Sequence, residues 1–119
     1  MTDADETRRS ALRWTGVCLD CADADELADF YHRLLGWEVA RSDGAGWVAM
    51  RAPAGGLDLL IQAEPWYEPP TWPEEPGRQA KMLHFEIEVD DLDAAVAHAV
   101  LGLVVGQPRA GHPFCLFAG

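Results

Sequence analysis

Hydrophobic and polar residues recur with strand or helix spacing in two separate stretches of this chain. In the first, residues 13–21 form a short apolar segment rich in aromatic and β-branched side chains, which predicts a strand. A helix is predicted from Asp23, whose carboxylate can cap the first turn together with Glu26, to Gly36. Its apolar stripe is predicted to consist of Leu27, Phe30, Tyr31, Leu34 and Leu35.

Three more strands are predicted to complete this first stretch, separated by turns that contain glycine. They cover residues 37–41, 47–51 and 57–63, so the order within residues 13–63 is β-α-β-β-β. The following residues, 64–81, contain five prolines and therefore cannot form a regular element. A long connection of this kind is usually a functional lid or a linker.

The second stretch begins with residues 82–89, in which polar and apolar side chains alternate. His84, Glu86 and Glu88 are predicted on one face of this strand. Asp90 or Asp91 then caps a second helix, which is predicted to end at Gly102. The buried stripe of that helix is predicted to be Leu92, Ala95, Val96, Ala99 and Val100.

Two further strands are predicted, at residues 103–105 and 113–117. The strand-to-helix joints VCLDCADADELADFY and FEIEVDDLDAAVAHA align, which indicates an internal repeat. The second unit, residues 82–119, is shorter than the first and shows two closing strands where three are expected. Either this unit is truncated, or residues around 105–109 are absent. The fold class expected is α+β, with two βαβββ units, the second incomplete, forming a cupped mixed sheet with the helices outside.

Length and charge narrow the class of protein. A length of 119 residues is that of one domain, which is expected over residues 13–119 after a flexible tail over residues 1–12. The net charge of −11 disfavours nucleic acids and anionic membranes as partners. The chain has no long apolar run, and no signal peptide is expected because residues 1–10 are polar and acidic. Three cysteines are too few for a disulfide scaffold, so we expect a cytoplasmic protein. Cys18 and Cys21 have CxxC spacing, but strand geometry is expected to direct them to opposite faces.

Several local motifs resemble one known family. ADADELADFYHRLLGWEV and VDDLDAAVAHAV resemble the two helices, and GHPFCLF the final strand, of the vicinal oxygen chelate superfamily, which includes glyoxalases, bleomycin-resistance proteins and dioxygenases. The resemblance covers residues 14–117 and is closest to glyoxalase-like proteins common in actinobacteria. It implies paired βαβββ units, a ligand cup and a homodimer.

The resemblance also implies where a divalent metal would bind, because family members take His, Gln or Glu ligands from the first and last strands of each unit. These places fall on Gly16, Gln62, His84 and Cys115 in this chain. Gly16 has no donor, which leaves His84, Gln62 and Cys115 as the metal candidates. Since Cys115 stands between Phe114 and Leu116, a buried and protonated thiol is expected. A catalytic metal generally needs three protein ligands. Only His84 matches the family pattern fully, because Gln62 aligns loosely and Cys115 stands where relatives with a metal usually have Glu, so binding without a cofactor is favoured.

Two functions are compatible with these residues. The first is a metal-free module that binds a small aromatic or hydrophobic molecule, with open volume above Gly16 and an aromatic wall from the connection. Its ligand-binding candidates are Trp14, Gly16, Cys18, Gln62, Trp66, Trp72, His84 and Cys115. The alternative is a glyoxalase-like lyase, isomerase or dioxygenase with His84 and Glu86 as catalytic candidates, in which His84 acts with a divalent metal or alone in proton transfer. The aromatic side chains could instead cover a sheet edge or a dimer interface.

Overall fold

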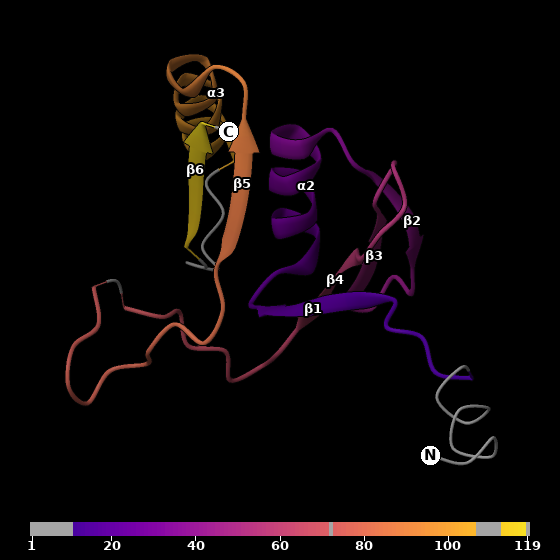
Figure 1. Ribbon diagram of the computed structural model, residues 1–119. Helices are drawn as coiled ribbons and strands as arrows, with labels where there is room; N and C mark the ends of the chain where they lie inside the picture. Colours follow the sequence, from indigo (N-terminus) through magenta and orange to yellow (C-terminus); the bar gives the residue numbers. More distant parts are fainter. Residues whose placement is uncertain (1–10, 72, 107–112, 119) are drawn as a thin grey trace, which may run out of the picture.

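The computed structural model describes residues 11–71, 73–106 and 113–118, which contain two helices and six strands (Figure 1). The helices are α2 (Ala24–Leu35) and α3 (Leu92–Gly106). The strands are β1 (Gly16–Cys21), β2 (Glu38–Ser42), β3 (Trp47–Arg51), β4 (Asp58–Ala63), β5 (Phe85–Val89) and β6 (Phe114–Ala118). The predicted α+β class is confirmed.

The first unit forms a four-stranded mixed sheet in the order β1-β4-β3-β2. β1 and β4 are parallel, whereas β3 is antiparallel to both β4 and β2. The predicted signals of α2 are confirmed: the Asp23 carboxylate accepts a hydrogen bond from the Glu26 N–H at 3.1 Å, and Gly36 ends the helix with a φ of 75°. Local sequence therefore determines this unit to a large extent.

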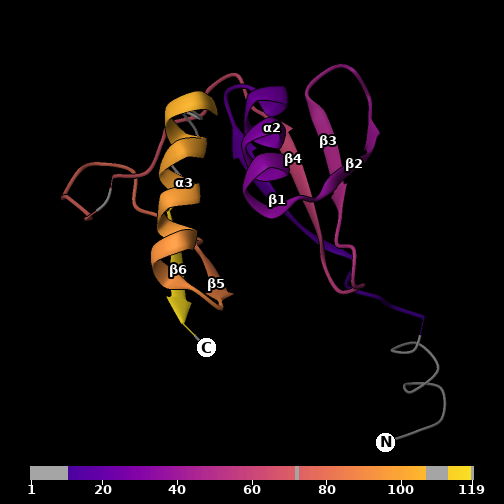
Figure 2. The ribbon, with the colours of Figure 1, turned by 90° about the horizontal axis from the view of Figure 1, so that it is seen from above.

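The core lies where α2 packs on one face of this sheet. Tyr31, at the centre of α2, is only 1% exposed. Its ring centroid lies 5.8 Å from that of Phe85 in β5, and the Phe30 ring lies 6.0 Å from that of Phe114 in β6. In Figures 1 and 2, α2 accordingly lies between the β5–β6 pair and strands β2 and β3. One helix thus joins the two units.

The second unit is incomplete. β5 and β6 form a two-stranded parallel sheet. Seven residues separate α3 from β6, whereas 22 separate α2 from β4. Seven residues cannot supply two five-residue strands and their turns, so the hairpin that corresponds to β2 and β3 is missing from this unit.

Two expectations for the second helix were wrong. α3 does not end at Gly102, and residues 103–105 are its last turns rather than a strand. A glycine inside a helix costs only about 1 kcal/mol relative to alanine, and the hydrogen bonds of another turn offset that cost. The predicted stripe is also not buried: Ala99 is covered, but Leu92, Val96 and Val100 are exposed, because a two-stranded sheet is too narrow to cover the helix.

The side chain of His98 in α3 forms hydrogen bonds with the end of α2. Its Nε2 lies 2.9 Å from the Arg33 carbonyl and 3.3 Å from the Leu34 carbonyl, both in the last turn of α2. These carbonyls have no partner within their own helix, so the imidazole satisfies them. His98 is exposed, and it therefore joins the two helices from the surface of the molecule. No helix among the described residues is both long and apolar enough to cross a membrane.

The buried Cys21 thiol should make stability depend on alkaline pH. Burial, with Asp23 as the next cause, raises the pKa of Cys21 from 9.0 to about 11. The unfolded chain therefore loses this proton at a lower pH than the folded chain, and the stabilisation is lost as pH rises through that interval. We expect the free energy of unfolding to fall more steeply with pH between 9 and 11 in wild type than in Cys21→Ala, measured by urea denaturation. Equal slopes in the two proteins would contradict this.

Candidate functional site

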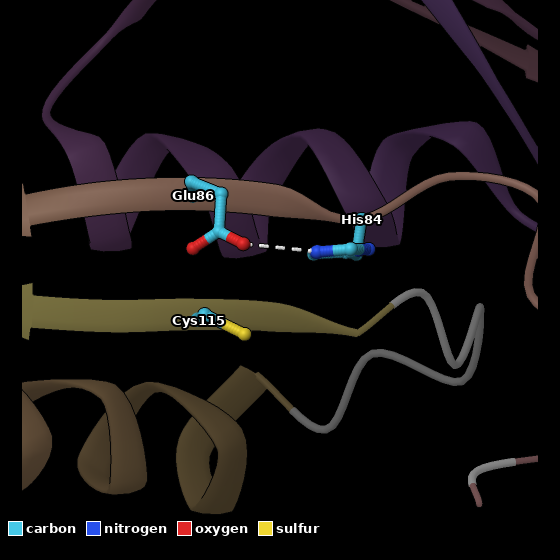
Figure 3. A group of neighbouring side chains, drawn as sticks. All are labelled: His84, Glu86 and Cys115. Atoms are coloured by element: carbon cyan, nitrogen blue, oxygen red, sulfur yellow. Dashed lines mark hydrogen bonds and ion pairs between the residues drawn. The ribbon is translucent and has the colours of Figure 1, made fainter.

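Three side chains of types that can ligate a metal lie together on the outward face of the two-stranded sheet: His84, Glu86 and Cys115. We call them the metal-ligating cluster. Glu86 of β5 is paired in register with Cys115 of β6, and His84 precedes Glu86 by two residues and so projects from the same face (Figure 3). The His84 Nε2 lies 3.0 Å from Glu86 Oε1. One ligand atom from each of the three residues lies within 4.8 Å of the other two. The strand pairing thus brings together residues about 30 positions apart.

The donor chemistry of this cluster fits a zinc ion. Nitrogen, carboxylate oxygen and thiolate sulfur are the three donor types that Zn²⁺ takes, and catalytic zinc sites use three protein ligands with one open position. Ligand atoms around a tetrahedral zinc are roughly 3.5 Å apart, so the three exposed side chains need only small adjustments. The expectation that Cys115 is buried was wrong: Phe114 and Leu116 face the other side of the sheet, and the thiol is exposed.

The remaining metal candidate, Gln62, lies in the other sheet. It is paired with Asp20 of β1 and Trp47 of β3, and its side-chain amide donates to the Ala63 carbonyl at 3.3 Å. The strand that neighbours Cys115 supplies Glu86 instead. Alternation along β5 was the sequence signal for Glu86, although we had assigned it to catalysis rather than to metal binding.

The space above Gly16 is not open as expected. A Cβ atom at this position would lie 2.9 Å from the Asp58 carbonyl and 3.2 Å from the Leu60 side chain, so the absent side chain allows β4 to approach β1 closely. Trp14, which precedes β1, donates from its indole Nε1 to the Gly16 carbonyl at 2.9 Å, and its ring is 75% exposed. Gly16 therefore offers no open volume to a ligand.

A cavity of about 530 Å³ lies between the end of β1 and the proline-rich connection. Its lining includes Cys18 of β1 and Trp66 of the connection, two of the predicted ligand-binding residues. Trp66 is 94% exposed, so most of its ring is open to a ligand. Trp72, another predicted member of the aromatic wall, lies outside the described residues. Tyr67, which the sequence also places in the aromatic wall of the connection, lines the cavity as well. Four further lining residues are not among those predicted from the sequence: Asp20, Glu64, Glu68 and Met82.

The electrostatics of the cavity are set by its carboxylates. Burial raises the pKa of the Cys18 thiol, and the negative charges of Asp20 and Glu64 raise it further. Burial, followed by Cys21 and Asp20, raises the pKa of Tyr67 to about 12. Both groups are therefore neutral at physiological pH, and the cavity carries the negative charge of its carboxylates. Alternation with Cys18 was the sequence signal that could have identified Asp20.

A second cavity of about 490 Å³ separates the edge of β5 from β1 and β4. Apolar side chains such as Val17, Trp37 and Phe85 dominate its lining. Glu86 lines this second cavity, whereas none of His84, Glu86 and Cys115 lines the first. The first cavity, which we call the aromatic cavity, is therefore separate from the cluster of His84, Glu86 and Cys115.

A comparison with models of protein families identifies the family of this domain. Residues 16–117 match the model of the glyoxalase-like domain. The chain belongs to the glyoxalase-like domain family. No curated protein gives a significant match to the chain.

Solved structures share the glyoxalase-like fold at low sequence identity. A hypothetical protein from S. aureus is 13% identical with a TM-score of 0.62, over 91% of this chain and 98% of that one. The fosfomycin resistance protein FosX from Listeria monocytogenes is 12% identical with a TM-score of 0.62, over 91% of both chains. Lactoylglutathione lyase from Agrobacterium tumefaciens is 17% identical with a TM-score of 0.54, over 88% and 92%. These similarities establish the fold of this glyoxalase-like domain.

Proposed function

We propose that this glyoxalase-like domain binds a small aromatic molecule that carries a positive charge. The observation that supports this proposal is the cavity of about 530 Å³ beside the proline-rich connection, whose size is that of ordinary small-molecule sites. Trp66 and Tyr67 supply aromatic surface at one side, and Met82 and Leu83 supply aliphatic surface. An aromatic ring could lie against these groups on the open side of the cavity.

The charge of the ligand follows from the polar groups of the same cavity. Asp20, Glu64 and Glu68 line it, and the whole chain carries a net charge of −11. An anionic ligand would therefore be repelled, whereas a protonated amine would be attracted to the carboxylates and to the face of the Trp66 ring. No metal takes part in this recognition.

The proposal is tested with three probes that share one ring and differ in charge. Calorimetric titration with tryptamine, tryptophol and indole acetic acid should show tryptamine binding best and the acid worst. Tryptamine should also slow the alkylation of Cys18 in a Cys115→Ser background, because Cys18 lines the cavity. Trp66→Ala should weaken tryptamine binding by about tenfold, the loss of one stacking or cation–π contact.

The matched control is Trp14→Ala, which removes another exposed tryptophan that does not line this cavity. It should leave both the affinity for tryptamine and the protection of Cys18 unchanged. If none of the three probes binds, or if the acid binds as well as the amine, the proposed ligand class is wrong.

The second candidate function is metal-dependent chemistry at His84, Glu86 and Cys115, favoured by the proximity of their ligand atoms. A divalent metal bound there would polarise oxygen atoms of a substrate as a Lewis acid. Glu86, whose carboxylate contacts His84, would hold the metal together with the imidazole and the Cys115 thiolate. This site lies outside the aromatic cavity, so a substrate would bind on the open face of the two-stranded sheet.

We propose that the domain functions in the cytoplasm. Cys18, Cys21 and Cys115 are all free thiols, which is the usual state in a reducing compartment. Neither nucleic acid nor a membrane surface is proposed as a partner, because the net charge of −11 opposes both. The homodimer implied by the resemblance to this superfamily is also proposed.

A further inference from the structure

Strand β6 has the composition of an interior strand but the position of an edge strand. Among the described residues it pairs only with β5, and in Figure 1 its other edge faces away from α2 and the four-stranded sheet. Its sequence, FCLFA, contains no charge, proline or glycine, and the side chain of Phe117 is 42% exposed. An unprotected apolar edge of this kind is a template for pairing with another strand.

The edge strand β2 of the first unit shows how this chain protects an edge that remains unpaired. β2, with the sequence EVARS, carries the charges of Glu38 and Arg41. Its register with β3 also shifts between Val39 and Arg41, an irregularity that hinders further pairing. β6 has neither a charged residue nor a shift in register, so neither of these features hinders the pairing of its free edge with another strand.

The first unit also shows what occupies the equivalent edge. There the last strand, β4, is parallel to β1 on one side and antiparallel to β3 on the other. β6 is parallel to β5, as β4 is to β1, but the hairpin that would supply the antiparallel neighbour is missing. The partner expected at β6 is therefore an apolar strand that runs antiparallel to it.

We propose that this partner is β6 of a second copy of the chain. A two-fold axis that joins two identical strands edge to edge makes them antiparallel, which is the direction that the first unit shows. The product is a sheet in the order β5-β6-β6-β5, which has four strands, as does the sheet of the first unit. Helix α3, which packs beside β6, would lie next to this junction (Figure 2).

Sedimentation equilibrium on the full chain tests this pairing. Wild type is expected to be a dimer whose affinity rises with salt, because salt screens the repulsion between two chains of net charge −11. In Cys115→Lys/Phe117→Lys, each lysine faces Glu86 or Glu88 of its own sheet, which supports the fold. Across the junction the lysines of the two copies would meet, so the dissociation constant should rise at least about tenfold.

Val39→Lys is the matched control, since it places a lysine on a half-exposed edge position of β2 and should leave the dimer intact. Hydrogen exchange of the unmodified chain gives an independent measurement: the amides of β6 should exchange more slowly as protein concentration rises. The proposal is overturned if wild type is a monomer at all concentrations, if the double variant dimerises as wild type does, or if the β6 amides exchange at a concentration-independent rate. Weakening of the dimer by salt would also overturn it. The pairing rests on the homodimer proposed above: a monomeric wild type would overturn both, whereas a double variant that dimerises as wild type does would overturn the β6 pairing alone. Because Cys115→Lys also removes a residue of the metal-ligating cluster, all measurements contain a chelator.

Discussion

Phe30→Ala is expected to destabilise the protein by about 3–5 kcal/mol, the usual cost of truncating a fully buried phenylalanine. Phe30 is buried in α2, and its ring contacts Tyr31 within the helix and Phe114 of β6. The substitution therefore leaves a cavity in the core and also removes a contact between the two units. Because small domains are stable by only about 5–15 kcal/mol, much of the total would be lost. Urea denaturation followed by circular dichroism measures the change.

Trp14→Ala is the control for this experiment, because it also removes a large aromatic ring, but one that is mostly exposed. Its effect is expected to stay below about 1 kcal/mol. If Phe30→Ala cost no more than Trp14→Ala, the packing of α2 between the two sheets would be disproved. A selective loss of β5 and β6 protection in hydrogen exchange would show that the contact with Phe114 holds the second unit in place.

The second large effect is expected at the metal-ligating cluster. Chelator-stripped protein should bind one Zn²⁺ with a dissociation constant on the order of micromolar or tighter, since three donors are already adjacent. His84→Ala should weaken this binding by at least about 100-fold, because even changes to groups behind the ligands cost metal sites about 10–100-fold. Titration calorimetry in the presence of a non-thiol reductant measures both values.

Two further variants separate the cluster from its surroundings. Cys115→Ser should also reduce the affinity for Zn²⁺ strongly, whereas Glu88→Gln, on the same face of β5 but outside the cluster, should retain it. Gln62→Ala should likewise have no effect, since Gln62 lies in the four-stranded sheet. Failure of the wild type to bind Zn²⁺, Ni²⁺, Mn²⁺ or Fe²⁺ would eliminate the metal-dependent function and leave the proposal for the aromatic cavity untouched.

Much of the candidate chemistry followed from alternation in single strands. His84 and Glu86 were assigned to one face because polar residues occupy every second position before and within β5, and the structure agrees. Cys18 and Cys21 were assigned to opposite faces of β1 for the same reason, and one thiol is exposed while the other is buried. Such predictions succeed because the pleat of a strand is a local property.

Other features could not be predicted from any single segment. The contact of Glu86 with Cys115 depends on the register between two strands, and the volume above Gly16 depends on the Leu60 side chain of a neighbouring strand. The cavity beside Trp66 depends on the path of a proline-rich connection that has no periodicity to interpret. Each of these is set by which surfaces meet in space.

The sequence by itself determined the α+β class, the capped helix α2 from Asp23 to Gly36, and the shortened second unit, because caps, periodicity and segment length act over a few neighbouring residues. Only the tertiary structure decided that α3 continues through Gly102 with Val96 and Val100 exposed. The burial of an apolar stripe requires a partner surface wide enough to cover it, and the two strands of the second unit are too few.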